Sequence, residues 1–434
     1  MKAKIQQLLR NHELPRNFHH SDHNSIQLWM TDNVIIIELS QIIAKISVWL
    51  EDTEEPFSYD YKISEILYSF NNHHKSREIS LRHHHPSEHI EPLSSPPSET
   101  QTLKIFIDLY YDDFGTFRTS YHSLGGLYVQ FGNMPLKLRQ QLKNHFLIGF
   151  VPFGGNFKDV IKPFINDILS LQKGVSMKIN NEDHWIVGGL GVVTADLPQG
   201  NDLAGNLRHN ANFGCRSCKA FKEELTILNF DTQQHGRYHH ITDDEFLEIR
   251  QAENRNSKAI LARSYGLLYE PNILDKLFRN RHTQTPQDPF HMIAGLGGRL
   301  LNSTFEVLTK EGLDAFLITW KSFEMPSTWS RQQNPITHRQ SYFMSDILRL
   351  TMIFPFLLIR FLSIEMVKSE VLQALKQRNS LNRRSQSLTM IMQCWINFAI
   401  LAKLVFTSTL QDSDYSNLTR LSNDFTSIVL KVMI

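Results

Sequence analysis

Two aspartates stand where an apolar run gives way to a turn. Asp112 follows the alternating run 103–110, and Asp196 follows the glycine-rich apolar run 185–195. Carboxylates at the ends of neighbouring strands hold the two divalent cations of many phosphoryl-transfer enzymes. Single acids at strand ends are also common in purely structural roles. From residue types alone, a two-metal site is therefore one of two open interpretations.

A Cys-x-x-Cys element, formed by Cys215 and Cys218, follows the second aspartate. This spacing is typical of one half of a tetrahedral zinc site. Its thiolates are flanked by Arg216 and Lys219, which favour ionisation. A redox pair and two simple buried thiols are the alternatives, although no thioredoxin-like strand precedes the element.

Composition limits the classes of protein that fit. The 434 residues carry 45 Lys and Arg against 44 Asp and Glu, so any nucleic-acid surface must be local. Three cysteines exclude a disulfide framework and indicate a reducing compartment. The N-terminus lacks the apolar segment of a signal peptide. The apolar run 348–366 contains Arg349, Arg360 and Glu365, which favours a buried helix over a membrane span. We expect an intracellular protein with no membrane partner.

The elements that must position these residues follow from the sequence pattern. Residues 1–71 are expected to be a mostly helical segment, and 72–101, rich in His, Pro and Ser, a disordered linker. The core is expected at 102–220. Residues 221–434 are expected to be helical and to end before the protein's natural domain is complete.

Within 102–220, three strands are predicted near 103–110, 125–131 and 146–155, joined by short connections as in an antiparallel meander. A helix over 157–171 and a strand over 185–195 follow. Strand–strand–strand–helix–strand with an acid after the first and fourth strands is the order of a ribonuclease H-like core. The predicted fold class is α/β, followed by a large all-helical region.

Six short elements resemble those of CACTA (En/Spm-type) transposases, in the family's order, over roughly residues 100–370. The segment 111–117 resembles D-G-F-N-P-F, 133–135 resembles N-L-P, and 148–154 corresponds to I-I-P-G. The segment 194–205 resembles N-D-F-P-A followed by L-S-G, 215–218 resembles C-P-Y-C, and 288–293 resembles D-x-M-H.

This resemblance implies an aspartate/aspartate/glutamate transposase that cleaves DNA and transfers strands with magnesium or manganese. Asp112 and Asp196 would be its first two metal-binding acids. Asp108 is the second choice, and Asp113, which replaces the family's Gly, would point the opposite way in a continuing strand. The implied partner is DNA at transposon ends, the implied location is the nucleus, and the resemblance also allows a homo-oligomer.

The later zinc-binding histidines and the catalytic Glu that would complete such a site are not found as a motif in the sequence. In the related vertebrate antigen-receptor recombinase, a C-x-x-C shares zinc with two later histidines that precede the catalytic Glu. Here no histidine follows His338. The alternative zinc partners are His282 with His291, or the His235, His239 and His240 cluster. Candidates for the third acid, none with a matching motif, are Glu306, Glu311, Glu324, Glu365 and Glu370.

We therefore expect an incomplete, inactive transposase-derived chain. The alternative is a non-catalytic domesticated or decayed module that binds DNA or a protein. Two basic groups are candidate DNA contacts. They are Lys376, Arg378, Arg383 and Arg384, and Arg279, Arg281 and Arg299.

Overall fold

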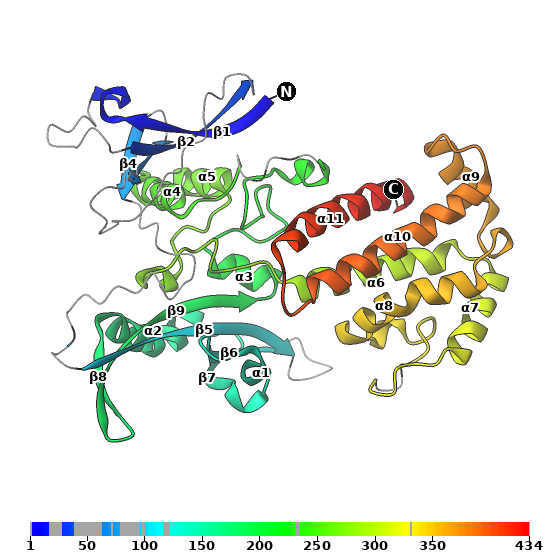
Figure 1. Ribbon diagram of the computed structural model, residues 1–434, viewed down its shortest axis with the longest axis horizontal. Helices are drawn as coiled ribbons and strands as arrows, with labels where there is room; N and C mark the ends of the chain where they lie inside the picture. Colours follow the sequence, from blue (N-terminus) through cyan, green and yellow to red (C-terminus); the bar gives the residue numbers. More distant parts are fainter. Residues whose placement is uncertain are drawn as a thin grey trace, which may run out of the picture. The chain divides into compact units, whose positions relative to one another are not determined.

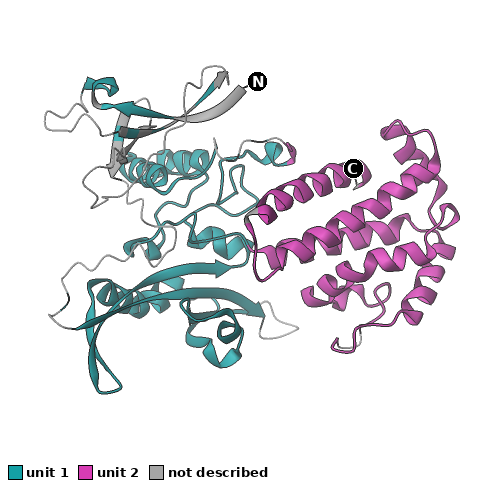
Figure 2. Ribbon diagram, in the orientation of Figure 1, with its two compact units in different colours: residues 1–225, 230–287 teal, residues 226–229, 288–434 magenta. Residues whose placement is uncertain are grey.

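The computed structural model describes residues 2–16, 28–38, 63–70, 73–78, 96, 100–115, 122–228, 230, 232, 235–329 and 332–433. The chain divides into two compact units, shown in Figure 2. One unit contains residues 1–225 and 230–287, and the other contains 226–229 and 288–434. The first unit thus reaches well beyond the predicted core boundary at 220.

The N-terminal segment forms a sheet, and the prediction of a mostly helical segment is wrong for its described residues. The strands are β1 (Lys2–Arg10), β2 (Leu28–Glu38), β3 (Ile63–Phe70) and β4 (His73–Glu78), in the order β1-β2-β3-β4. The run Val34–Ile37, within the segment expected to be mostly helical, lies in β2 and pairs with β1. Consecutive β-branched side chains favour extended backbone, which explains the difference.

The predicted linker also begins too early. Residues 73–78 form β4, whose His73 pairs with Phe70 of the antiparallel strand β3. Backbone pairing between strands needs no apolar side chains, so the polar sequence gave no indication of this strand. Most of the remaining linker, 79–95 and 97–99, lies outside the described residues, as do residues 39–50 of the segment expected to be mostly helical.

The first unit contains a five-stranded mixed sheet (Figure 1). Its strands are β5 (Gln101–Gly115), β6 (Ser123–Phe131), β7 (Phe146–Val151), β8 (Val175–Ile179) and β9 (Glu182–Ala195). Their order is β7-β6-β5-β9-β8. The predicted antiparallel meander of β5, β6 and β7 is confirmed, and β9 runs parallel to β5. The α/β class is confirmed.

Strand β8 was not predicted. It pairs with β9 through a two-residue turn at Asn180 and Asn181, whose φ angles are 51° and 70°. Asparagine tolerates this left-handed conformation, and two such residues are typical of a tight hairpin turn. The Asn-Asn pair was the signal that could have revealed the strand.

Helix α2 (Phe157–Lys173) covers one face of the sheet (Figure 1). It begins at Asn156, whose side chain accepts a hydrogen bond from the Lys158 backbone, and ends at Gly174 with φ 89°. Its buried Ile161, Ile165 and Ile168 pack with the inward side chains of β5, β6 and β9. The rest of this unit contains α1 (Leu136–Arg139), α3 (Leu197–Leu203), α4 (His239–Gln251) and α5 (Arg255–Tyr265).

The second unit is helical, as predicted for this part of the chain. It contains α6 (Pro289–Val307), α7 (Lys310–Ser322), α8 (Met344–Phe361), α9 (Ser369–Arg378), α10 (Arg384–Val405) and α11 (Asp412–Met433). The rings of Phe316, Phe354, Trp395 and Phe398 contact one another in its core, in tilted and edge-to-face pairs. The apolar run within 348–366 is largely α8, whose inner face is buried, as expected.

Among the described residues, one helix, α10, is long and apolar enough to cross a membrane by length and composition. Core helices of water-soluble proteins meet the same criterion. In this protein Trp395 and Phe398 of α10 lie in the core of the helical unit.

Candidate functional site

The parallel pairing of β5 and β9 brings the two acid-bearing segments to one edge of the sheet. Tyr111 pairs with Ala195. Asp112 and Asp196 are the next residues of the two segments, so they follow this pair at adjacent positions. Strand β5 nevertheless continues past Asp112 to Gly115, pairing with β6 as far as Ser123. The expected turn directly after Asp112 is therefore wrong.

Because β5 continues, Asp112 and Asp113 face opposite sides of the sheet. Asp112 accepts a hydrogen bond from Tyr110 Oη at 3.1 Å, on the face away from α2. Asp113 accepts one from Tyr111 Oη at 2.9 Å, and the Tyr111 ring packs against Phe157 of α2. Asp113 thus points to the opposite face from Asp112, as predicted for a strand that continues.

Gln199 connects Asp113 with Asp196. Asp196 caps α3, its Oδ1 accepting a hydrogen bond from the Gln199 backbone at 3.0 Å. The Gln199 side chain donates to Asp113 Oδ2 at 3.1 Å. The β5 acid tied to Asp196 through one residue is thus Asp113, while Asp112 lies on the other face.

A cation and a third aspartate complete this group. Arg208 donates to Asp202 Oδ2 at 2.7 Å. The pKa of Arg208 is raised first by this hydrogen bond and by the Asp202 charge, and also by Asp113 and Asp196. Burial, then the hydrogen bond to Asp113, raises the pKa of Tyr111. The group therefore comprises the carboxylates of Asp113, Asp196 and Asp202 and one internal counter-charge, Arg208.

Asp108, the second choice for the first acid, has a structural role. It is 8% exposed and accepts from Arg139 Nη2 at 2.9 Å. Its other oxygen accepts from the Val192 backbone at 2.9 Å, where the register of β5 and β9 shifts. A Cβ on Gly191 would come within 2.2 Å of Asp108, so glycine is required there. Asp108 holds an irregularity in the sheet.

The Cys-x-x-Cys loop folds back on itself. The Ser217 backbone donates to Cys215 Sγ at 3.4 Å, and Cys218 pairs with Gly236 in an isolated bridge. The pKa of Cys215 is well below its ordinary value, chiefly because its sulfur accepts a hydrogen bond from Cys218. The pKa of Cys218 is raised by donating that bond and by burial. Both thiols are free, and the loop presents a half-buried thiolate-prone sulfur beside a buried one.

Arg216, between the two cysteines, is fully buried. Its guanidinium donates to the carbonyl oxygens of Thr285 at 3.1 Å and Pro286 at 2.6 Å. It also donates to the Leu197 carbonyl and to Asn201 Oδ1, both at 3.3 Å. Arg216 therefore fastens α3, the helix capped by Asp196, to the cysteine loop.

His282, proposed as a zinc partner, is committed to a structural role. Its Nδ1 donates to the Arg216 carbonyl at 3.0 Å, and its Nε2 lies 2.9 Å from Thr242 Oγ1. Burial, followed by the charges of Arg237 and Arg281, lowers its pKa to about 2. Both ring nitrogens are occupied and the ring is neutral. The prediction of His282 as a zinc ligand is not supported by these contacts.

The other candidate histidines have separate environments. His239 Nδ1 accepts from the Arg281 backbone at 3.1 Å. His291 contacts Asp288, the residue that caps α6. Gly236 lies in an isolated bridge with Cys218, outside α4, and separates His235 from that helix. Within the described ranges, no group of three or more His, Cys, Asp or Glu side chains is arranged to hold one metal ion.

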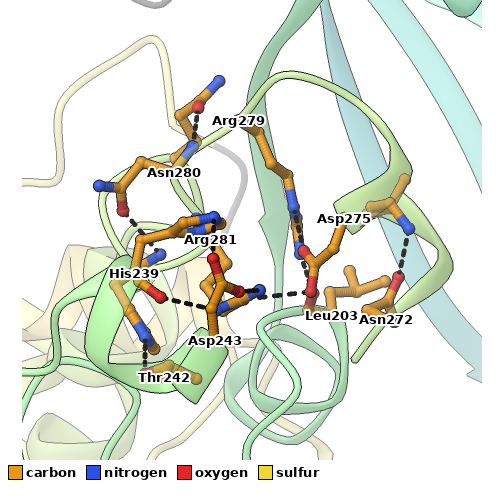
Figure 3. A network of polar contacts seen from close by, with 12 residues as sticks. Leu203, His239, Thr242, Asp243, Asn272, Asp275, Arg279, Asn280 and Arg281 are labelled. Atoms are coloured by element: carbon orange, nitrogen blue, oxygen red, sulfur yellow. Dashed lines mark hydrogen bonds and ion pairs between the residues drawn. The ribbon is translucent and has the colours of Figure 1, made fainter. Parts of the chain in front are cut away.

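Arg279 and Arg281, two of the candidate DNA contacts, are buried, and the candidate role is wrong for both. Arg279 and Arg281 are 7% and 1% exposed. Figure 3 shows both guanidinium groups turned toward Asp275. Arg279 Nε donates to Asp275 Oδ1 at 2.7 Å, and Arg281 Nε donates to Oδ2 at 3.1 Å. A buried charge requires such a partner, which is why basic residues in this stretch are not surface contacts.

Arg281 continues the network to α4 (Figure 3). It donates to the His239 carbonyl at 3.0 Å and pairs with Asp243. Arg279 donates to the Leu203 carbonyl at the end of α3 at 2.7 Å. The network thus connects the end of α3, the loop around 275–281 and α4.

The remaining predicted DNA contacts are surface residues. Arg299 lies on α6, and Arg378, Arg383 and Arg384 lie at the end of α9 and the start of α10; all four are exposed. Lys376 is half-buried.

The candidate third acids all belong to the helical unit. Glu311 and Glu370 lie in the first turns of α7 and α9, where a carboxylate complements the helix dipole. Glu365 was expected inside an apolar helix, but it is exposed in a 3₁₀ turn, Ile364–Met366. A hydrogen bond from Ser363 lowers its pKa. Helix α8 ends at Phe361, so Glu365 needs no buried partner.

Compared with protein-family models and with curated proteins, the chain shows no significant match to either.

Proposed function

We propose that this protein derives from a metal-dependent DNA transposase of the CACTA type, with a ribonuclease H-like core formed by β5, β6, β7, α2 and β9. The supporting observation is the parallel register of β5 and β9. It aligns Tyr111 with Ala195, so that acids from two distant segments follow at the same edge of the sheet. Active transposases cleave DNA and join strands with two metal ions held by such acids.

In the proposed site, Asp196 would hold magnesium or manganese together with an acid of β5. The sequence favours Asp112, whereas the hydrogen bonds through Gln199 favour Asp113. A bound divalent ion would supply charge to activate an attacking oxygen and to stabilise a leaving oxygen. The proposed partner is DNA, with the nucleus as the place of action.

The cysteine loop is the proposed zinc half-site. Cys215 and Cys218 have the i, i+3 spacing of zinc ligands, and a backbone N–H is directed at the Cys215 sulfur. Such donors stabilise a thiolate. Zinc there would brace the loop from which Arg216 reaches α3.

A second candidate function is a non-catalytic DNA- or protein-binding module. One observation favours it: Arg208 is paired with Asp202, and its pKa is also raised by Asp113 and Asp196. A cation that already compensates these acids reduces their attraction for a divalent ion. A decayed enzyme that kept its fold would carry this kind of internal pair.

Manganese titration tests the proposal. Binding of Mn²⁺ should be measured calorimetrically for the wild type and for Asp196→Asn, Asp112→Asn and Asp113→Asn. Asp183→Asn, an exposed acid at the other end of β9, serves as the matched control. Loss of binding in Asp196→Asn and in one β5 variant, with the control unchanged, is expected. Equal Mn²⁺ affinity in Asp196→Asn would contradict the proposed metal site.

Nicking of supercoiled DNA separates the two candidate functions. Manganese-dependent nicking that is lost in Asp196→Asn would identify an enzyme. Mn²⁺ binding or DNA binding without nicking would identify the non-catalytic module.

A further inference from the structure

A hollow of about 790 Å³ opens in the helical unit, at the end of α7 and the loop that follows it. Its volume is in the range of pockets for small organic ligands. Three aromatic rings and three consecutive amide side chains contribute to the lining: Trp320, Phe323, Trp329, Gln332, Gln333 and Asn334. Nothing in the proposed metal chemistry uses this loop.

The deepest of the amides carries an unsatisfied acceptor. Gln332 is 9% exposed, and its Nε2 donates to Asp346 Oδ1 at 3.0 Å. The carboxylate fixes the amide orientation, because only the NH₂ group can donate to it. Gln332 Oε1 is then buried with no hydrogen-bond partner in the part of the chain that the structure describes. Such an atom costs free energy until a donor reaches it.

The two neighbouring amides present the opposite group. Gln333 Oε1 accepts from Ser341 Oγ at 3.0 Å, and Asn334 Oδ1 accepts from the Ile336 backbone at 2.9 Å. Tyr342 Oη holds the same loop by donating to the Gln333 carbonyl at 2.5 Å. With their oxygens engaged, these amides keep their NH₂ groups as donors for a ligand.

The rings supply flat apolar surface next to positive charge. The Arg349 guanidinium lies over the Trp329 ring at 6.0 Å, and the Arg360 guanidinium lies over Phe323 at 5.1 Å. Lys321 and His338 also line the hollow. Among the described residues that line the hollow there is no acid, although Arg349 also pairs with Asp346 at 3.5 Å. The surroundings therefore favour a planar ligand with an attached anion.

We propose that this hollow binds an unstacked nucleobase together with its phosphate. A base stacks on an aromatic ring and presents donors and acceptors along one edge, matching the rings and the amides. Lys321 and His338 suit the phosphate. An aliphatic ligand would leave the amide groups without hydrogen-bond partners, and a bare anion would not stack on the aromatic rings. The base comes either from a single-stranded nucleic acid or from a free nucleotide.

Fluorescence anisotropy with labelled 12-nucleotide single strands tests the site in EDTA, so its outcome is independent of the proposed metal site. Trp329→Leu should weaken binding about 10-fold, because stacking on one ring is worth that order of affinity. Trp329→Phe should retain most of it. The matched control is Ile318→Ala on α7, an exposed apolar side chain that does not line the hollow.

Competition distinguishes the two sources of the base. Displacement of the strand by a mononucleotide at micromolar concentration would identify a free nucleotide as the ligand, and its absence would identify the strand. Full binding by Trp329→Leu would overturn the proposal, as would equal affinity for duplex DNA, whose bases are stacked.

A second variant examines the polar half of the site. An oligo(dC) strand can donate its exocyclic amino group to Gln332 Oε1, whereas oligo(dT) offers a carbonyl oxygen at that position. The wild type should prefer oligo(dC) a few-fold, and Gln332→Leu should remove the preference while keeping the stacking. An unchanged preference in Gln332→Leu would exclude Gln332 as the acceptor.

Discussion

The guanidinium of Arg216 lies directly against Gly200, where a Cβ would come within 2.4 Å of Nη1. This close approach lets Arg216 hydrogen-bond to Leu197 and Asn201 of α3. Helix α3 begins at Asp196, so the cysteine loop holds in place the helix that this acid caps. The proposed metal-binding acids and the proposed zinc half-site are mechanically connected through one side chain.

Replacing Gly200 with alanine should destabilise the protein. The new methyl group would displace Arg216, with a loss of about 1–3 kcal/mol, as is usual for overpacking. Gly295→Ala is the matched control, because Gly295 lies in α6 with no atom within 4 Å of an added Cβ. That change should stabilise by about 0.5–1 kcal/mol through helix propensity. Urea unfolding of both variants checks the signs, and equal effects would disprove the contact.

Asp275→Asn should be among the most destabilising single substitutions. Asp275 is the partner of both Arg279 and Arg281, which are buried. Leaving these charges without it should cost about 3–5 kcal/mol. Asp424→Asn removes an exposed pair with Arg420 and should cost less than about 1 kcal/mol. If thermal unfolding placed Asp275→Asn within experimental error of the wild type, the network would have no stabilising role.

Acid should destabilise the first unit through His282. Its folded-state pKa of about 2 lies below the ordinary value of 6.5, so the unfolded chain takes up the proton first. The stabilisation is complete above the unfolded pKa and is lost as pH falls below it toward 2. Between pH 7.5 and 5 the loss should be about 2 kcal/mol.

The variant His282→Asn keeps a donor for the Arg216 carbonyl but does not titrate. Urea unfolding at both pH values should show a smaller loss in this variant than in the wild type. The exposed His209 provides the control, His209→Asn, which should behave as the wild type. An identical pH dependence for His282→Asn would contradict the assignment.

Zinc content should depend on Cys215 and not on Cys394. Cys394 lies buried in the core of the helical unit, far along the chain from the cysteine loop. Protein purified with zinc should lose the metal in Cys215→Ser and keep it in Cys394→Ser, as measured by plasma emission spectroscopy. The same zinc stoichiometry in the wild type and Cys215→Ser would refute the half-site.

Several features of the site were predictable because they depend on neighbours in the sequence. Asp196 before Pro198, and Asp288 before Pro289, mark helix starts through side-chain caps. The apolar spacing from Phe157 onward predicted α2. The strand β8 was missed because its signal was only the Asn180-Asn181 turn.

The N-terminal sheet and the burial of the charged residues could not be predicted in this way. A run such as Val34–Ile37 becomes a strand only when β1 lies beside it. Arg279 and Arg281 look like surface cations until Asp275 is found between them. A strand partner distant in the sequence decides the first outcome. The second depends on how the 275–281 loop folds, because burial of Arg279 and Arg281 turns a nearby Asp275 into their shared partner.

The sequence by itself determined the alternation of strands and helices around the sheet, because periodicity and capping act over a few residues. It also brought Asp112, Asp196, Cys215 and Cys218 forward as the residues with chemical potential. Only the tertiary structure decided that β5 continues past Asp112, so that Asp113 is the acid joined to Asp196 through Gln199. It likewise decided that His282 and Arg216 are buried and hold neighbouring segments together through hydrogen bonds. Strand pairing sets which face of the sheet a side chain occupies. Burial sets whether an ionisable side chain is neutral or must be paired with an opposite charge. Both depend on the folded chain.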